Sequence, residues 1–395
     1  MDSLTQITLG AAVGVAVMGR RTAVWKAALW GGIAGTVPDL DVVIDHGNAV
    51  LNMVRHRAES HSFFYLTLLS PLLAWLVSRI HSDPRSAGAW GSTGQPPGRP
   101  KAGPAPSGGS DPRSGGAWGS TGQPPCRPKA GPVPSGGSDS RSVGAWGSHF
   151  LRWWLALWLV LMTHPLLDAM TIYGTQLLMP FSNHPFGVGS LFIIDPAYTV
   201  PLIVGVVAAL RLKNARGLRW NGAALMLSTL YLGWSALAQQ HVERIARASL
   251  QAEGLSPQAL LVTPSPFNTV LWRMVATTPD QYFEGFYSLL DATPTVRWTA
   301  HPRGADLLQQ HRSNDSVQRI AAFTKGLFSL QRVDGRLLLT DLRMGQEPAY
   351  VFRFDVGTQP PVQLSARPDL RRGLPWLWDR IRGIDAPMPV AVAID

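Results

Sequence analysis

The chain has 395 residues, of which 46% are hydrophobic and only 15% are charged, and its formal net charge is +10. The N-terminal two thirds contains long charge-poor runs, and most acidic residues follow residue 240. This distribution is typical of a membrane region joined to a soluble region, and it argues against a protein that is soluble throughout.

Six apolar segments predict a helical membrane region. The first two are rich in Gly and Ala, which favours close helix packing in lipid, but each is shorter than the roughly 20 residues that span a bilayer. Tilted, partly inserted and re-entrant placements therefore stay open for both. The segments are residues 7–19, 23–37, 62–78, 150–170, 198–210 and 222–238. Asp2 and the lack of Lys or Arg before the first segment argue against a cleaved signal peptide.

A repeat of 28 residues separates the third and fourth segments, with copies that begin at Ser82 and Ser110 and a truncated copy from Ser138. Pro, Gly and Ser dominate each copy, so the repeats cannot bury enough apolar area to offset the entropy of ordering. We expect residues 81–149 to be a disordered insert without chemistry. The insert contains the single cysteine, Cys126, and one cysteine excludes an intrachain disulfide and a cysteine-based zinc site.

Residues 241–395 predict a soluble α+β domain with an antiparallel sheet. Asp334-Gly335 is a strong hairpin signal between two strands, and residues 306–311 are typical of a helix. Three further stretches alternate like half-buried strands: residues 271–278, 282–290 and 349–357. No cluster of side chains in this domain predicts catalysis.

The charge pattern gives the membrane region two unlike faces. If all six segments cross, the basic loops fall on one side, which the positive-inside rule makes cytoplasmic. The positive charge therefore indicates membrane topology rather than nucleic-acid binding. The outer side receives the C-terminal domain and the following residues: Asp39, Asp41, Asp45, His46, His56, Glu59, His61, His164, Asp168, His184 and Asp195. Residues 153–210 contain no Lys or Arg, so a divalent metal would supply the missing positive charge.

The stretch "HPLLD" places His164 and Asp168 four residues apart, on one face of a helix. Both lie near the end of an apolar segment, where ionisable groups are costly and are candidates for function. An imidazole and a carboxylate at this spacing can chelate one metal, or the carboxylate can orient the histidine. The alternative is a hydrogen-bonded polar bridge between helices.

The stretch "PDLD" places Asp39 and Asp41 at the end of the second segment, where acidic residues oppose the helix dipole. Two adjacent carboxylates also repel each other unless a cation bridges them, so the pair favours a metal site over an ordinary polar turn. Asp45 and His46 follow in a more loop-like stretch, and we rank them lower.

The stretch "HRAESHS" places His56 and His61 before the third segment. Their spacing of five residues need not put them on one helical face, but a turn could direct both inward. Ser60 or Ser62 could cap the segment that follows. The alternative is a pair of exposed loop histidines, and we take His149 and His184 as bystanders.

Asp195 lies between apolar residues and precedes Pro196, so a ligand, a carboxylate that orients a ligand and a helix cap all stay open. The chain lacks a GxSxG elbow, a GxxxxGK[ST] loop and a credible GxGxxG motif. These absences argue against an α/β-hydrolase and against nucleotide binding by such loops.

Several motifs together resemble the YdjM-type family of bacterial inner-membrane proteins, described as membrane-bound metal-dependent hydrolases. They are "MDSLTQITLGAAVG", "AALWGGIAGTVPDLD", "HRAESHS", "MTHPLLDAMTIYGTQLLMPFS" and "FIIDPAYTVPL". The resemblance covers about residues 1–80 and 150–240 and implies an all-helical core with a metal centre. It implies these ligands: Asp39, Asp41, His56, His61, His164 and Asp168. Glu59 departs from the apolar residue usual at its position, and Gln6 stands where some relatives have His.

We therefore expect a mainly α, multi-pass helical membrane domain in residues 1–80 and 150–240 of a bacterial inner-membrane protein, followed by a soluble α+β domain. One or two divalent ions, zinc first and manganese or iron as alternatives, would activate water for attack on an ester. A phosphoester or lipid head group is the expected substrate by analogy. Glu59 or Asp195 would act as general base or orient a ligand. The alternative is a non-catalytic scaffold or small transporter with a structural His/Asp cluster.

Overall fold

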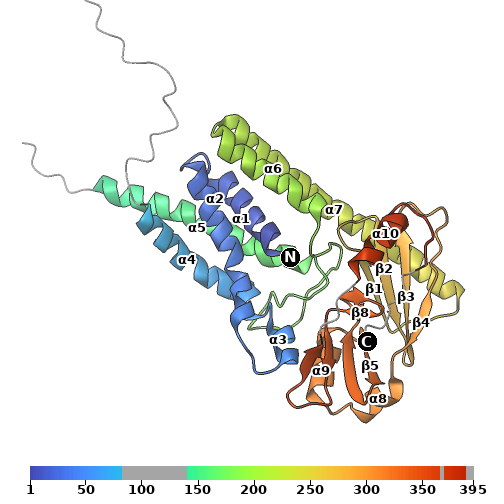
Figure 1. The fold of residues 1–395 in the computed structure, drawn as a ribbon. Helices are drawn as coiled ribbons and strands as arrows, with labels where there is room; N and C mark the ends of the chain where they lie inside the picture. Colours follow the sequence, from blue (N-terminus) through green and yellow to red (C-terminus); the bar gives the residue numbers. More distant parts are fainter. Residues whose placement is uncertain (82–139, 365–368, 388–395) are drawn as a thin grey trace, which may run out of the picture.

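The computed structural model describes residues 1–81, 140–364 and 369–387, with the backbone alone for 140–148. Most of the predicted repeat insert, including Cys126, lies outside these residues. Helix α5 begins at Ser140 and so takes up the last part of the predicted insert. Figure 1 shows a helical part in the N-terminal half and a β-rich part in the C-terminal half.

Each of the six predicted apolar segments forms a helix. The helices are α1 (Ser3–Met18), α2 (Val24–Thr36), α4 (Phe63–Ile80), α5 (Ser140–Ala169), α6 (Pro196–Leu212) and α7 (Ala215–Ala252). Between α2 and α4 the chain forms three short turns of helix: η1 (Pro38–Val43), α3 (Ala49–Arg55) and η2 (Glu59–His61). The "PDLD" motif lies in η1, and "HRAESHS" runs from the residue after α3 through η2 to Ser62. These short elements lie at the end of the helical part that faces the β-rich part (Figure 1).

Glycines allow α1 and α2 to approach each other at backbone distance. A Cβ atom at Gly10 would lie 2.3 Å from the carbonyl oxygen of Gly31, and a Cβ atom at Gly31 would lie 2.2 Å from the carbonyl oxygen of Gly10. No side chain fits at either position without moving the backbone. The Gly- and Ala-rich composition of both segments therefore serves close helix packing, as predicted.

Two of the helices are long and apolar enough to cross a bilayer, among the residues that the structure describes. They are α4 and residues 149–169 of α5, whereas α1 and α6 are apolar but shorter. The outward faces of the helices are nevertheless apolar, with exposed Leu68 and Leu72 on α4, Val200 and Val204 on α6, and Leu230 and Leu237 on α7. Length and composition thus support two membrane crossings, and the other four crossings stay a prediction.

The C-terminal part is α+β with antiparallel sheets, as predicted. One sheet has the order β1 (Ala259–Pro264), β2 (Leu271–Thr277), β3 (Gln281–Ser288), β4 (Thr299–Pro302). The other has the order β10 (Val362–Leu364), β9 (Arg353–Asp355), β6 (Arg336–Asp341), β5 (Phe328–Val333). A small ribbon pairs β7 (Gly345–Gln346) with β8 (Ala349–Tyr350), and the helices are α8 (Ala305–Gln310), α9 (Asp315–Phe323) and α10 (Leu370–Ile381).

The predicted hairpin joins β5 and β6, and both of its turn residues, Asp334 and Gly335, have positive φ. That conformation is the one a two-residue hairpin requires, which explains the Asp-Gly pair. The prediction of half-buried strands was wrong for β2, which is buried along its whole length. Trp272 packs with α7 on one side of the sheet, while Val275 packs with Leu342 on the other.

Residues 349–357 also differ from the prediction of one strand, because they form two short strands, β8 and β9, in different sheets. Tyr350 is fully buried beside β2, whereas Phe354 belongs to the core of the second sheet. The alternation of apolar and polar residues in 349–357 thus comes from two buried residues, Tyr350 and Phe354, that lie on either side of a bend and in different cores.

Candidate metal centre

Four of the predicted ligands converge at the end of α5. His164 and Asp168 come from α5, Asp39 from η1 and His61 from η2, and one ligand atom from each lies within 4.8 Å of the others. His61 Nε2 is 3.1 Å from both His164 Nε2 and Asp168 Oδ2. Asp39 Oδ1 is 3.4 Å from the Nε2 atom of each histidine, and Asp168 Oδ2 is 3.6 Å from His164 Nε2.

Five of the six separations, at 3.1–3.6 Å, are close to those of a tetrahedral metal site. Ligand atoms about 2.0–2.1 Å from a tetrahedral zinc lie about 3.3 Å from one another. Three of the four side chains are almost completely buried, and the Asp39 side chain is 21% exposed. Among these four side chains, Asp39 is therefore the one through which solvent reaches the centre.

Hydrogen bonds direct both imidazoles toward the centre. The Nδ1 atom of His164 is 2.7 Å from the carbonyl oxygen of Gly35, which can only accept, so Nδ1 carries the proton and Nε2 offers its lone pair. The Nδ1 atom of His61 lies 2.9 Å from Ser60 Oγ, which donates its own proton to Asp41 at 2.6 Å. Such contacts behind a histidine ligand fix its tautomer and orientation.

Asp41 and His56 lie behind the convergent group and are not members of it. The Asp41 carboxylate accepts from Ser60 Oγ, from the backbone N–H of Arg57 at 2.9 Å and from His56 Nδ1 at 3.0 Å. Its Oδ2 atom lies 3.8 Å from His61 Nδ1. The geometry therefore gives Asp41 the position of a residue that orients His61, and His56 the position of a partner to Asp41.

Asp168 also contacts three further groups. Its Oδ2 atom lies 3.3 Å from Arg57 Nε, and its Oδ1 atom accepts from Gln6 Nε2 at 3.0 Å and from the N-terminal amine of Met1. The expectation of a face with little cation thus overlooked Arg57, which is buried and stacks on the ring of Tyr173 at 4.8 Å. The arginine of "HRAESHS" was the available signal.

Burial and hydrogen bonding oppose each other in the pKa values of the centre. Burial opposes the charged form of His61, but hydrogen bonds to Asp168 and Asp39 outweigh it and raise its pKa. Burial raises the pKa of Asp39, but hydrogen bonds from His164 and His61 lower it by more than burial raises it. The pKa of Asp39 is therefore well below its usual range. Burial likewise acts on Asp41, whose bonds from His56, Ser60 and the Arg57 backbone lower its pKa to about 2.

The remaining predicted residues lie elsewhere. Glu59 is exposed on η2, and Asp45 and His184 are also exposed. Asp195 caps α6 by accepting from the backbone N–H groups of Ala197 and Tyr198, and it also accepts from Tyr231 Oη at 2.9 Å. Ser62 caps α4, which was one of the two options left open.

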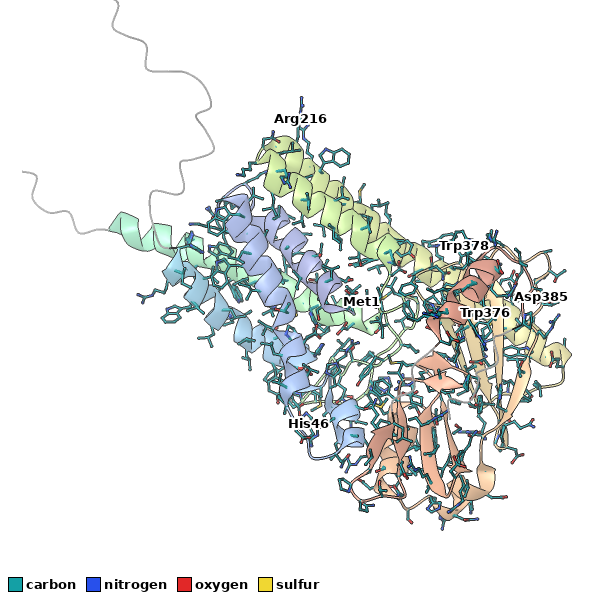
Figure 2. The ribbon with its side chains drawn as sticks, in the orientation of Figure 1. Met1, His46, Arg216, Trp376, Trp378 and Asp385 are labelled. Atoms are coloured by element: carbon teal, nitrogen blue, oxygen red, sulfur yellow. The ribbon has the colours of Figure 1, made fainter. Side chains whose placement is uncertain are left out.

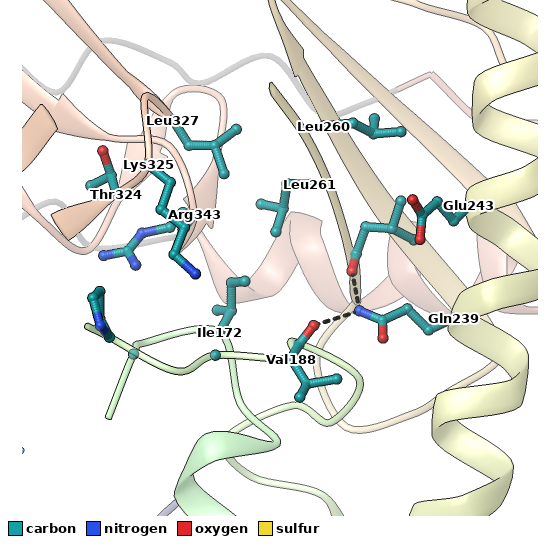
Figure 3. A pocket seen from close by; sticks show the side chains of 14 residues that line it. Ile172, Val188, Gln239, Glu243, Leu260, Leu261, Thr324, Lys325, Leu327 and Arg343 are labelled. Carbon is teal, nitrogen blue, oxygen red and sulfur yellow. Dashed lines mark hydrogen bonds between the residues drawn. The ribbon is translucent and has the colours of Figure 1, made fainter. Parts of the chain in front are cut away.

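A separate pocket of about 230 Å³ lies between the C-terminal part and residues 172–188, the loop that follows α5 (Figure 3). Gln239 of α7 lies at its edge and donates to the carbonyl oxygens of Val188 at 2.7 Å and Val262 at 2.8 Å. None of the four convergent residues lines this pocket. The pocket therefore marks the junction between the two parts of the molecule and not the candidate metal centre.

Comparison with known proteins identifies a matching family. Residues 1–242 match the family model described as "YdjM inner membrane protein". No curated protein and no solved structure matches the chain. The matched range includes all four convergent residues and ends within α7.

Proposed function

The chain belongs to the YdjM family of inner membrane proteins, and from this premise we propose that it is a membrane-bound, metal-dependent hydrolase. The observation that supports this most strongly is the convergence of Asp39, His61, His164 and Asp168 at the separations of a tetrahedral site. When bound, a divalent ion supplies an acidified water and polarises the ester that is hydrolysed.

We propose one ion, held by these four residues, with zinc as the metal. Two imidazoles and two carboxylates suit zinc better than the harder magnesium or calcium. Asp41 and Ser60 hold His61, and Gly35 holds His164, so that both Nε2 atoms face the same point. Manganese and iron stay as the alternatives.

The surroundings of the centre favour an anionic, amphiphilic ester. Asp39 and Asp168 would balance the charge of a divalent ion. The Arg57 guanidinium and the N-terminal amine of Met1, which both contact Asp168, add positive charge against the one further carboxylate, Asp41, behind His61. Residues directly after Asp39 form an exposed apolar edge: Leu40, Val42, Val43 and Ile44. A phospholipid head group with its acyl chains against this edge fits both features.

The lipid bilayer is the environment of the helical part, because the family is one of inner membrane proteins. We propose that α1, α2, α4, α5, α6 and α7 all cross it, with the basic loops in the cytoplasm and the metal centre and C-terminal domain on the outer side. The exposed leucines and valines on α4, α6 and α7 support lipid contact on all three helices. Residues 1–80 and 150–240 then form the membrane domain, and 241–395 the soluble domain.

Metal content tests the proposal directly. The His164→Ala, Asp168→Ala double variant should lose bound zinc, measured by mass spectrometry on protein purified without added metal. The matched control is His184→Ala with Asp45→Ala, because the same two residue types are exposed there. The control should keep the wild-type stoichiometry. Equal zinc in both variants would contradict the metal centre and favour a non-catalytic membrane protein.

Activity is tested separately, on the wild-type protein with phospholipid vesicles. Release of the phosphorylated head group should require zinc and stop when a chelator removes it. Zinc binding without head-group release, or with release of a different ester product, would keep the metal centre and exclude this substrate class.

A further inference from the structure

Helix α10 has two unlike faces. Trp376 and Leu377 are buried and pack against Leu271 and Phe286 of the first sheet. On the other side, Leu370, Leu374 and Trp378 recur every four residues and therefore form one stripe along the helix. Their exposed fractions are 61%, 49% and 61%. Figure 2 shows Trp376 and Trp378 on this helix at the edge of the C-terminal part.

Exposure of a tryptophan and two leucines in one stripe is costly in water. Burying a leucine side chain is favourable relative to leaving it in water. The stripe is flanked by Arg371 and Arg382, and the Arg382 guanidinium lies 5.6 Å from the ring centre of Trp378. Leucine and tryptophan on one side with arginine at the border are typical of helices that lie in the interface of a membrane.

The sheet contacts of α10 place it level with one end of the apolar stretch of α7. Trp234 of α7 donates to Thr269 Oγ1 at 3.2 Å, and this stretch ends four residues further on, at Ala238. Thr269 is followed closely by Leu271, the first residue of β2, against which the buried face of α10 packs. The α10 stripe thus lies at about the same height along α7 as Ala238, where the apolar stretch of α7 ends.

We propose that α10 is an interfacial helix: its Leu370, Leu374 and Trp378 stripe enters the lipid surface, and Arg371 and Arg382 at the border of the stripe contact anionic head groups. Tryptophan prefers the interface between lipid and water, and arginine is attracted to an anionic lipid surface. The proposal rests on the proposed crossing of α7. It concerns residues outside the range that matches the family, and it fixes the C-terminal domain against the membrane at a second point.

Spin labelling of the full chain in anionic-lipid nanodiscs tests this, because Cys126→Ser leaves no other cysteine. A nitroxide at Leu374→Cys should collide with oxygen, which concentrates in lipid, more than with a water-soluble nickel complex. Arg372→Cys is the matched control, since it is exposed on the same helix about 200° around its axis. It should show the reverse preference. A second label at Leu370→Cys should repeat the result for Leu374.

The outcomes separate the proposal from its premise. A label at Leu230→Cys on α7 reports whether that helix is in lipid, so a water-exposed Leu230 would contradict the membrane placement itself. A lipid-exposed Leu230 with water-exposed labels at Leu374 and Leu370 would overturn the interfacial helix alone. Spin–spin broadening at Leu374 that disappears on dilution with unlabelled protein would assign the stripe to a second copy of the chain and overturn the proposal.

Discussion

At the scale of single residues, Arg57 and a bound cation compete for one carboxylate. Asp168 Oδ2 lies 3.3 Å from Arg57 Nε and 3.1 Å from His61 Nε2, where a metal would be held. Arg57 also has φ of 68°, a left-handed conformation that its backbone bond to Asp41 supports. Without metal, Arg57 is thus a main source of positive charge next to Asp168.

Arg57→Gln should therefore destabilise the metal-free protein more than the zinc-loaded protein. Loss of one partner from a buried ion pair costs about 3–5 kcal/mol, and a bound cation would replace much of the missing charge. Thermal unfolding in detergent, with chelator and with zinc, measures the difference. Arg247→Gln is the control, because its ion pair with Glu243 is exposed. Equal losses with and without zinc would contradict the shared role of Asp168.

The pKa of His61 predicts opposite pH trends for the two states. Because bonds to Asp168 and Asp39 raise that pKa in the folded protein, the stabilisation by protonated His61 is complete below the unfolded value of about 6.5. It is lost as the pH rises through the raised folded value. Zinc must displace this proton, so zinc affinity should instead fall as the pH decreases through the same range.

Unfolding temperature across pH, with chelator and with zinc, checks these trends. The chelated protein should lose the His61 contribution with rising pH, whereas the zinc-loaded protein should gain stability. Exposed His184 provides the control, and His184→Gln should leave both trends unchanged. Parallel curves for the two states would show that zinc and the His61 proton do not compete.

Sequence motifs predicted which residues could approach the centre but not their order around it. The i, i+4 spacing of His164 and Asp168 was enough to place both on one side of α5. It could not separate Asp39, which faces the histidines, from Asp41, which accepts from Ser60, because both follow Pro38 in the same short 3₁₀ turn. Gly35 and Ser60 entered the site through hydrogen bonds that no spacing rule predicts.

At the scale of elements, the contact between α1 and α2 positions part of the centre. Gln6 of α1 reaches Asp168, and Gly35 of α2 accepts from His164. The two helices touch through Gly10 and Gly31, where the backbones meet directly. A change in the distance between α1 and α2 would therefore move the contact of Gln6 with Asp168 relative to that of Gly35 with His164.

Gly31→Ala should destabilise the protein by about 1–3 kcal/mol, because the new Cβ atom would overlap the Gly10 carbonyl and force the backbones apart. Gly222→Ala in α7 is the matched control, since a Cβ atom added there would have no neighbour within 4 Å. It should be neutral or slightly stabilising, as alanine favours a helix. Thermal unfolding in detergent measures both, and a similar effect of the two changes would contradict close packing of α1 on α2.

Apolar runs in the sequence were enough to predict the helices, whereas the alternation of apolar and polar residues did not predict how deeply β2 is buried. The six segments were identified because a charge-poor apolar run is visible in a single sequence. Burial of β2 on both sides depends on α7 and on Leu342 of a later segment, and neither is local to the strand. Long-range partners of this kind decide whether an alternating strand is half-buried or fully buried.

At the scale of the whole molecule, the C-terminal domain contacts the loops that position the metal centre. Arg343 donates to the carbonyl oxygen of Tyr173 at 2.9 Å, and it pairs with buried Asp341 at 2.7 Å. The Tyr173 ring lies under the Arg57 guanidinium, and its hydroxyl donates to the Met53 carbonyl at 2.8 Å. A continuous set of contacts thus links the second sheet to Arg57.

Arg343→Met should consequently weaken zinc binding without removing a ligand. The change leaves Asp341 buried without its partner, at a cost of about 3–5 kcal/mol, and releases Tyr173 from the domain. Asp341→Asn together with Arg343→Met should recover part of the stability but not the zinc affinity, because the contact with Tyr173 stays broken.

Arg319→Met is the control, since its pair with Asp315 is exposed and contributes only about 0.3–0.5 kcal/mol. Chelator competition measures zinc affinity, and unfolding measures stability. If Arg343→Met lowered the unfolding temperature while zinc affinity stayed at the wild-type value, the domain would stabilise the fold without shaping the centre.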